Sequence, residues 1–155
     1  MIPQFEQLNE EETTLMLDTL PLITVLIAGA DGNIDEEEKA WAEKLTNIRS
    51  FAREDSLTDY YKLADEHFAE KLSIFLNSLP SDVAARNAEI GHRLSGLNSI
   101  LPKLDVNFAL RFRKGLNSFA EHVAKASGGF LRMGSISKEE KDLIDLPMID
   151  QVVVE

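Results

Sequence analysis

The spacing of its apolar residues constrains the fold of this chain more than any other feature. These residues recur three and four positions apart along several long segments, the repeat of one face of an α-helix. No segment shows the sustained alternation of apolar and polar residues that a half-exposed strand requires. The 155 residues fit one domain, 1–155. We therefore predict an all-α fold, a compact bundle of about six helices.

The first expected helix opens with the acids that follow Asn9 and runs to about Ala30. It is apolar nearly all round, which predicts a position in the centre of the core. Pro21 lies inside it, so the helix either kinks there or restarts with Pro21 in its first turn. The second helix begins after Asp35 as its N-cap, with an expected buried stripe of Ala40, Trp41, Leu45 and Ile48.

Proline and capping residues bound the later helices. The third spans about 56–79 and stops at Pro80, and the fourth is capped by Ser81 and runs to about 101. Asp105 caps the fifth, and a short sixth begins at Ser137. The buried stripe of the third helix is Tyr60, Leu63, Ala64, Phe68, Leu72, Phe75 and Leu79, and that of the fifth is Phe108, Phe112, Leu116, Phe119 and Val123.

The formal net charge is −11, with an isoelectric point near 4.7. Nucleic acid and anionic membranes would repel such a chain at long range, whereas cations and basic proteins would be attracted. Acidity also simply keeps a protein soluble, and this alternative stays open. Residues 1–38 contain no Lys or Arg, and 86–114 is locally basic. The basic stretch either contacts the acidic part within the molecule or forms a separate, solvated face, which is the default expectation.

The chain contains no cysteine, which excludes disulfides, thiolate metal sites and cysteine nucleophiles. Its most apolar run, 20–30, is about half as long as a membrane-spanning helix. No basic region precedes that run, as it would in a signal peptide. We therefore expect a cytoplasmic protein without direct membrane insertion.

Two stretches of the sequence echo each other, 32–39 and 134–141. In each, a glycine starts a turn, an isoleucine follows it, and a capping residue opens a helix that continues with Glu and Lys. This pattern predicts two weakly related helix-turn-helix corners with clustered carboxylates at the start of the second helix. The alternative is that both are merely well-capped helices.

The first corner partly matches the calcium-binding loop of an EF-hand. Its second half fits the pattern through Asp31, Gly32, Ile34, Asp35 and Glu38. Its first half does not, because Ile27 and Gly29 stand where the leading acids belong. The sequence thus argues against a true calcium loop and leaves weak binding of a divalent cation such as Ca²⁺ by Asp31, Asp35 and Glu38 as a hypothesis.

Residues 28–38 also resemble the A-x-A-D-G-x-I-x-x-x-E signature of the tellurite-resistance TerB-like family, and 134–141 resembles its second signature. The resemblance implies a helical bundle of two related halves, an acidic vertex that binds divalent metal, and a non-catalytic role in stress-response or membrane-associated assemblies. It implies Asp31, Asp35 and Glu38 as metal ligands, with Glu140 at the matching place in the second corner. The second corner departs from the pattern, since Met133 and Ser137 stand opposite Asp31 and Asp35.

Two further functions remain open from sequence. Glu89 and His92 have the Glu-x-x-His spacing that places two metal ligands on one helix face, so a helical metalloprotein or metalloenzyme is the alternative of a different class. A ferritin-like di-iron site needs a second such motif, and the sequence has none. The remaining alternative is a structural adaptor without a small ligand, in which the acidic corner serves only as a helix cap.

Overall fold

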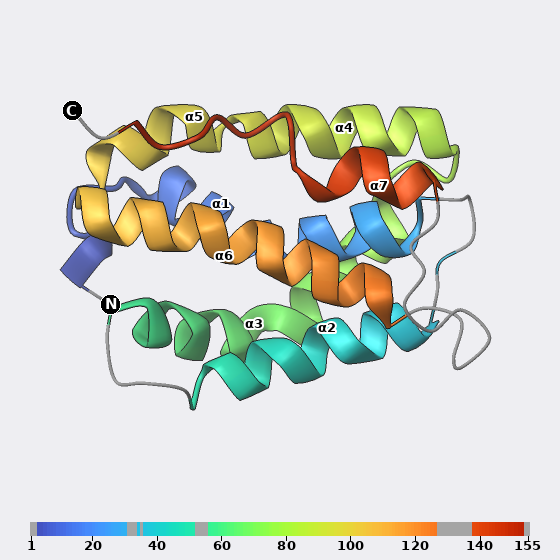
Figure 1. Cartoon of the computed structure of the whole chain (residues 1–155), viewed down its shortest axis with the longest axis horizontal. Helices are drawn as coiled ribbons and strands as arrows, with labels where there is room; N and C mark the ends of the chain where they lie inside the picture. Colours follow the sequence, from blue (N-terminus) through green and yellow to red (C-terminus); the bar gives the residue numbers. More distant parts are fainter. Residues whose placement is uncertain (1–2, 31–33, 35, 52–55, 127–137, 154–155) are drawn as a thin grey trace.

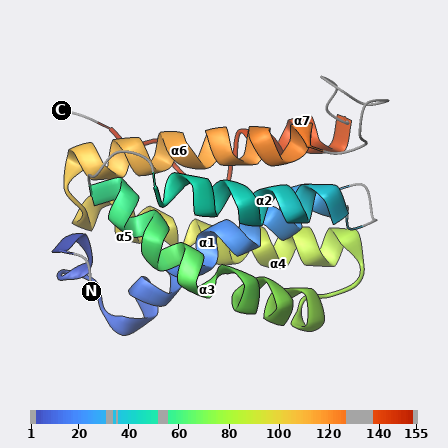
Figure 2. The same cartoon turned by 90° about the horizontal axis from the view of Figure 1, so that it is seen from below.

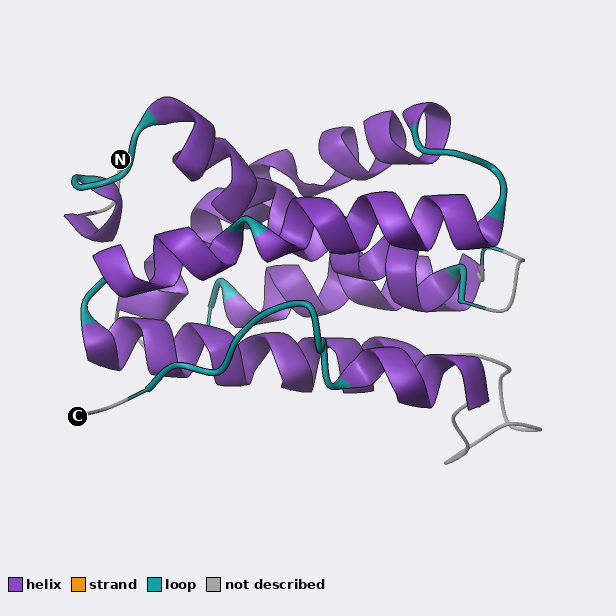
Figure 3. Cartoon of the chain, turned by 90° about the horizontal axis from the view of Figure 1, so that it is seen from above, coloured by secondary structure: helices purple, strands orange, loops and turns teal. Residues whose placement is uncertain are grey.

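The computed structural model of the chain describes residues 3–30, 34, 36–51, 56–126 and 138–153. A 3₁₀ turn, Pro3–Phe5, precedes α1 (Glu10–Ala28), α2 (Glu36–Arg49) and α3 (Ser56–Ser78). The chain continues through α4 (Val83–Ser95), the single turn α5 (Leu97–Ile100) and a second 3₁₀ turn (Leu101–Lys103). The last helices are α6 (Val106–Lys125) and α7 (Lys138–Ile144). The described residues form helices and loops without a strand, which confirms the all-α prediction (Figure 3).

Helix α1 is the centre of the bundle, as its composition predicts. It contacts each of the helices α2 to α7, and every residue from Thr19 to Ala28 is buried. In Figure 1, α4 and α5 form one side of the molecule and α2 and α3 the opposite side, with α1 and α6 between them. Pro21 lies within one continuous helix, so α1 does not restart there. No helix in the described ranges combines the length and apolar character needed to cross a bilayer.

The N-terminus of α1 is closed by a reciprocal capping box. The side chain of Asn9 accepts a hydrogen bond from the backbone N–H of Glu12 at 2.8 Å, and the Glu12 carboxylate accepts one from the Asn9 N–H at 3.0 Å. Two of the donors that a helix start leaves unpaired are satisfied in this way. Lys103 then donates to the same carboxylate at 2.6 Å, so the start of α1 is tied to the turn before α6.

The stripes expected for the third and fifth helices are confirmed. On α3 the predicted residues are buried, apart from the half-buried Leu63, and on α6 all of them are buried. Asp105 caps α6 by accepting from the N–H of Phe108 at 3.1 Å, as predicted. Rings from different helices meet edge-on in this core, where Tyr60 of α3 lies 5.1 Å from Phe112 of α6, measured between ring centroids.

The expected fourth helix is wrong in two respects. Its N-cap is Asp82 rather than Ser81, because the Asp82 carboxylate accepts the N–H of Ala85 at 2.9 Å. The helix also ends at Ser95 instead of continuing to about 101. At Gly96 a Cβ atom would lie 2.8 Å from Cδ2 of Leu15, so glycine permits α1 to approach closely where α4 gives way to α5.

The stripe expected for α2 is largely wrong. Of the four predicted residues only Leu45 is buried, while Trp41 is half-buried and Ile48 is 48% exposed. The buried side chains of α2 are instead Glu38, Ala42, Leu45 and Thr46. This face of α2 turns inward because the helix contacts α1, α3 and α6 at once. No single apolar stripe in the sequence of α2 predicts which face that is.

Candidate functional site

The first corner joins the end of α1 to the start of α2. Gly29 caps α1, and its N–H donates to the carbonyl of Val25 at 2.9 Å. Ile34, the isoleucine of the first echoed stretch, is half-buried and packs against the core. Asp31 and Asp35, two of the proposed metal ligands, lie outside the described residues, and so does the Asp35 cap.

Glu38 is the proposed ligand whose environment the structure describes. Its side chain is only 2% exposed, in the first turn of α2. The preceding Glu36 and Glu37 are exposed, and Glu36 pairs with Lys39 at 3.0 Å. The positive end of the α2 dipole lies beside these carboxylates and offsets part of their mutual repulsion. The corner therefore combines one buried acid with a solvated acidic rim.

The second corner precedes α7, and most of it, including Ser137, lies outside the described residues. Glu140 is on α7, but its side chain is not described. Helices α2 and α7 both begin at the same end of the bundle, as two perpendicular views show (Figures 1 and 2). The starts of the two helices that follow the echoed stretches therefore lie at one end of the bundle.

Neither metal hypothesis gains a complete ligand set from the described residues. Within the ranges given above, which omit Asp31 and Asp35, no three His, Asp or Glu side chains are grouped to hold a metal ion. On α4, the Glu89 carboxylate pairs with Arg93 at 2.9 Å, and His92 is exposed. Glu89 therefore already has a cation beside it on its own helix.

Two arginines of the basic stretch are buried, contrary to the expectation of a solvated face. Arg86 is 6% exposed, and its Nη2 donates to the carbonyl of Gly29 at 2.8 Å. This contact brings α4 to the end of α1, directly before the acidic corner. A Cβ atom at Gly29 would lie 2.5 Å from Nη2 of Arg86, so a larger residue there would force this contact to shift.

Arg113 of α6 is 2% exposed and holds the C-terminal segment in place. Its Nη2 donates to the carbonyls of Asp145, Leu146 and Ile149, at 3.0, 3.2 and 3.0 Å. Burial lowers the pKa of the Arg113 guanidinium, and the negative charges of Asp145 and Asp150 oppose this shift. The guanidinium stays protonated at neutral pH, so a cation surrounded by carbonyl oxygens fixes the turn after α7.

The turn held by Arg113 has further anchors. The side-chain nitrogen of Asn117 donates to the carbonyl of Ile144 at 2.9 Å. Leu146 is fully buried and has a positive φ of 50°, a conformation that costs energy for a residue with a side chain. These contacts join residues far apart in sequence, so the sequence pattern carries no signal for them.

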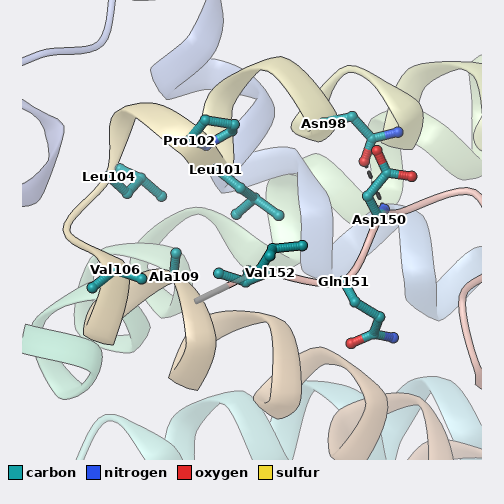
Figure 4. Close-up of a pocket in the computed structure, with 10 residues that line it drawn as sticks. Asn98, Leu101, Pro102, Leu104, Val106, Ala109, Asp150, Gln151 and Val152 are labelled. Atoms are coloured by element: carbon teal, nitrogen blue, oxygen red, sulfur yellow. Dashed lines mark hydrogen bonds between the residues drawn. The ribbon is translucent and has the colours of Figure 1, made fainter. Parts of the chain in front are cut away.

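The segment beyond this turn borders an apolar pocket of about 390 Å³. Figure 4 shows Leu101, Leu104, Val106, Ala109 and Val152 around it, with Asn98 and Asp150 at one end. The Asp150 N–H donates to Oδ1 of Asn98 at 2.7 Å, and Nδ2 of Asn98 donates to the carbonyl of Met148 at 3.1 Å. Both polar functions of Asn98 thus hold the tail. Among the described lining residues, Asp150 supplies the charged group of the pocket.

A smaller pocket of about 270 Å³ lies where α3 turns into α4. It is lined mostly by apolar side chains, including Val25, Ile34, Leu76 and Leu79, and Arg86 is the cation in its wall. Sequence reasoning missed this pocket because its wall comes from α1, α3, α4 and the first corner together.

Compared with known protein families, with characterised proteins and with solved structures, the chain matches none.

Proposed function

We propose that this protein is a non-catalytic, TerB-like interaction module whose first corner binds a divalent cation or a basic protein surface within a stress-response assembly. The observation that supports this proposal best is Glu38, a 2% exposed carboxylate in the first turn of α2. Its burial has to be balanced by favourable partners, because an ionised carboxylate loses several kcal/mol of hydration when it is taken out of water. A cation bound at the corner would be one more favourable partner for the Glu38 carboxylate.

The surrounding charge favours a cation over an anion at this corner. Glu36 and Glu37 are exposed next to Glu38, and the first 38 residues contain no Lys or Arg. Hard cations such as Ca²⁺ take carboxylate and carbonyl oxygens as ligands. Asp31 and Asp35 would complete the set in this proposal, with Glu140 as a further candidate ligand.

Thermal unfolding of the metal-stripped chain tests the cation. We expect a saturable rise in Tm with Ca²⁺ or a similar ion, since an ion bound only to the folded state adds about 2.7 kcal/mol of stability at one hundred times its Kd. The double variant Asp31→Asn, Glu38→Gln should lose this rise. The matched control is Glu10→Gln, Glu11→Gln, which removes the same formal charge from the exposed start of α1 and should keep the rise.

A basic partner is tested with the single tryptophan, Trp41, which lies half-buried on α2 near the corner. Titration with a lysine-rich peptide should change Trp41 fluorescence in the wild type and in the Glu10→Gln, Glu11→Gln control, but not in the corner variant. If neither divalent ions nor the peptide act on the wild type, the proposal fails and the structural adaptor becomes the better explanation.

A further inference from the structure

Arg86 is a buried cation whose hydrogen-bonding capacity is only partly used. Its Nη2 donates to the carbonyl of Gly29 at 2.8 Å, whereas its Nε is buried and has no hydrogen-bond partner. Among the described side chains, none forms an ion pair with it. Buried polar groups in proteins are paired in the great majority of cases, so an unused donor on a buried charge calls for an explanation.

The pocket in front of this guanidinium has the character of a small ligand site. Among the described lining residues, Val25, Ile34, Phe75, Leu76, Leu79 and Pro80 supply the apolar wall, and Ser81 and Arg86 supply the polar groups. Small-molecule sites are mostly apolar, with a few polar groups that fix the orientation of the ligand. At about 270 Å³ the cavity suits a compact molecule rather than a drug-sized one.

We propose that this pocket binds a small monocarboxylate with an apolar body, whose carboxylate pairs with Arg86 and whose body contacts α1 and α3. The planar guanidinium matches the two oxygens of a carboxylate, which would meet its terminal nitrogens, since Nε itself is shielded from solvent. The apolar wall distinguishes this class from inorganic phosphate, which would leave most of its oxygens without donors there. The pocket shares Ile34 with the first corner, but Glu38 is not among its described lining residues.

The carbonyl of Gly29 explains how Arg86 is held ready for such a ligand. It accepts from Nη2 and thereby orients the guanidinium, while the absent Cβ at Gly29 leaves room for this approach. Arg86 also lies in the first turn of α4, where the helix dipole favours an anion over a cation. A carboxylate at this place would therefore interact favourably with both the side chain and the helix end.

The test uses NMR of the full chain, with the Nε–H signal of Arg86 assigned through the Arg86→Lys variant. We expect benzoate to shift this signal and the methyl signals of Leu76 and Leu79 saturably. Benzamide, the neutral analogue of the same shape, should bind about tenfold more weakly or not at all, since a hydrogen bond to a charged partner contributes more than a neutral one. Inorganic phosphate should leave the signals unchanged.

A pocket-filling variant locates the binding without touching Arg86. Leu76→Phe, in the pocket wall, should abolish the benzoate shifts, whereas Leu63→Phe, at a half-buried leucine elsewhere on α3, should keep them. Absence of saturable shifts in the wild type, equal binding of benzoate and benzamide, or full binding by Leu76→Phe would each overturn the proposal. The proposal would also be overturned if benzoate bound the Asp31→Asn, Asp35→Asn variant but not the wild type. That result would mean that the carboxylates of Asp31 and Asp35 already pair with Arg86.

Discussion

The guanidinium of Arg49 donates a 2.6 Å hydrogen bond to the phenolic oxygen of Tyr61 and lies 5.3 Å from the centre of the same ring. The other donors of Arg49 reach α6, at the carbonyl of Gly115 (3.1 Å) and the hydroxyl of Ser118 (3.0 Å). One side chain of α2 thus joins α3 and α6. This role explains why the face of α2 that carries Arg49 packs inward although it is not the most apolar one.

Removing this junction should destabilise the fold. We expect Arg49→Ala to cost about 2–4 kcal/mol, because Tyr61 and Ser118 lose a charged partner in a half-buried place. Tyr61→Phe should cost about 1 kcal/mol. Urea unfolding measures both. Arg93→Ala, which breaks an exposed pair with Glu89, serves as the control and should stay within about 0.5 kcal/mol. An equal loss for Arg49→Ala and Arg93→Ala would contradict the proposed junction.

Two glycine substitutions should act in opposite directions. Gly91 lies inside α4, and a Cβ there would have no neighbour within 4 Å, so Gly91→Ala should stabilise by about 0.5–1 kcal/mol through the higher helix propensity of alanine. At Gly29 a Cβ would lie 2.7 Å from Cδ1 of Ile34 and 2.5 Å from Nη2 of Arg86. Gly29→Ala should therefore destabilise by about 1–3 kcal/mol. Thermal unfolding of the two variants side by side measures the difference in sign, and a stabilising Gly29→Ala would show that the Arg86 contact is dispensable.

Stability should fall at alkaline pH because of the two tyrosines. Burial raises the pKa of Tyr60 well above its usual value, and that of Tyr61 is raised by burial despite the opposing Arg49 charge. Below the unfolded pKa of about 10 both states hold the phenolic proton, so the contribution is fully present. Between this pH and the higher folded-state pKa, only the unfolded state releases the phenolic proton. In that range the free energy of unfolding falls by about 1.4 kcal/mol per pH unit for each tyrosine.

Tyr60→Phe provides the check on this pH dependence. The variant loses the hydrogen bond from the Tyr60 hydroxyl to the carbonyl of Met16, so it should be less stable at neutral pH. Its stability should nevertheless decline less steeply above pH 10 than that of the wild type, as urea unfolding across this range would measure. Phenolate absorbance of the folded wild type should stay low in the same range. Identical slopes for both proteins would mean that Tyr60 is not the group responsible.

The C-terminal segment should detach when Arg113 is replaced. Arg113→Met leaves the carbonyls of Asp145, Leu146 and Ile149 without their shared donor, and we expect a loss of about 3 kcal/mol or more. Hydrogen exchange should increase first across residues 144–150. Asn98→Ala should speed exchange of the Asp150 amide while the turn at 144–146 stays protected. Uniform exchange in both variants would contradict separate anchoring of the turn and the tail.

The sequence was sufficient to predict the features that depend on residues close together in the chain. Periodic apolar residues set the buried faces of α3 and α6, Asp105 set the start of α6, and the nearly uniform apolar character of α1 set its central place. These features follow from contacts within one or two helical turns, or from the amount of apolar surface to be buried, so a one-dimensional pattern contains them.

The contacts that join distant parts of the chain become visible only in the packed bundle. Arg86 meets the carbonyl of Gly29 and Arg113 meets those of 145–149, at separations no periodicity encodes. A charged residue counts as surface in a sequence pattern, yet these two are buried because helix ends and a tight turn offer them carbonyl oxygens. The face that α2 turns inward was settled for the same physical reason: Arg49 finds its partners on two other helices, and their positions are fixed only when the bundle packs.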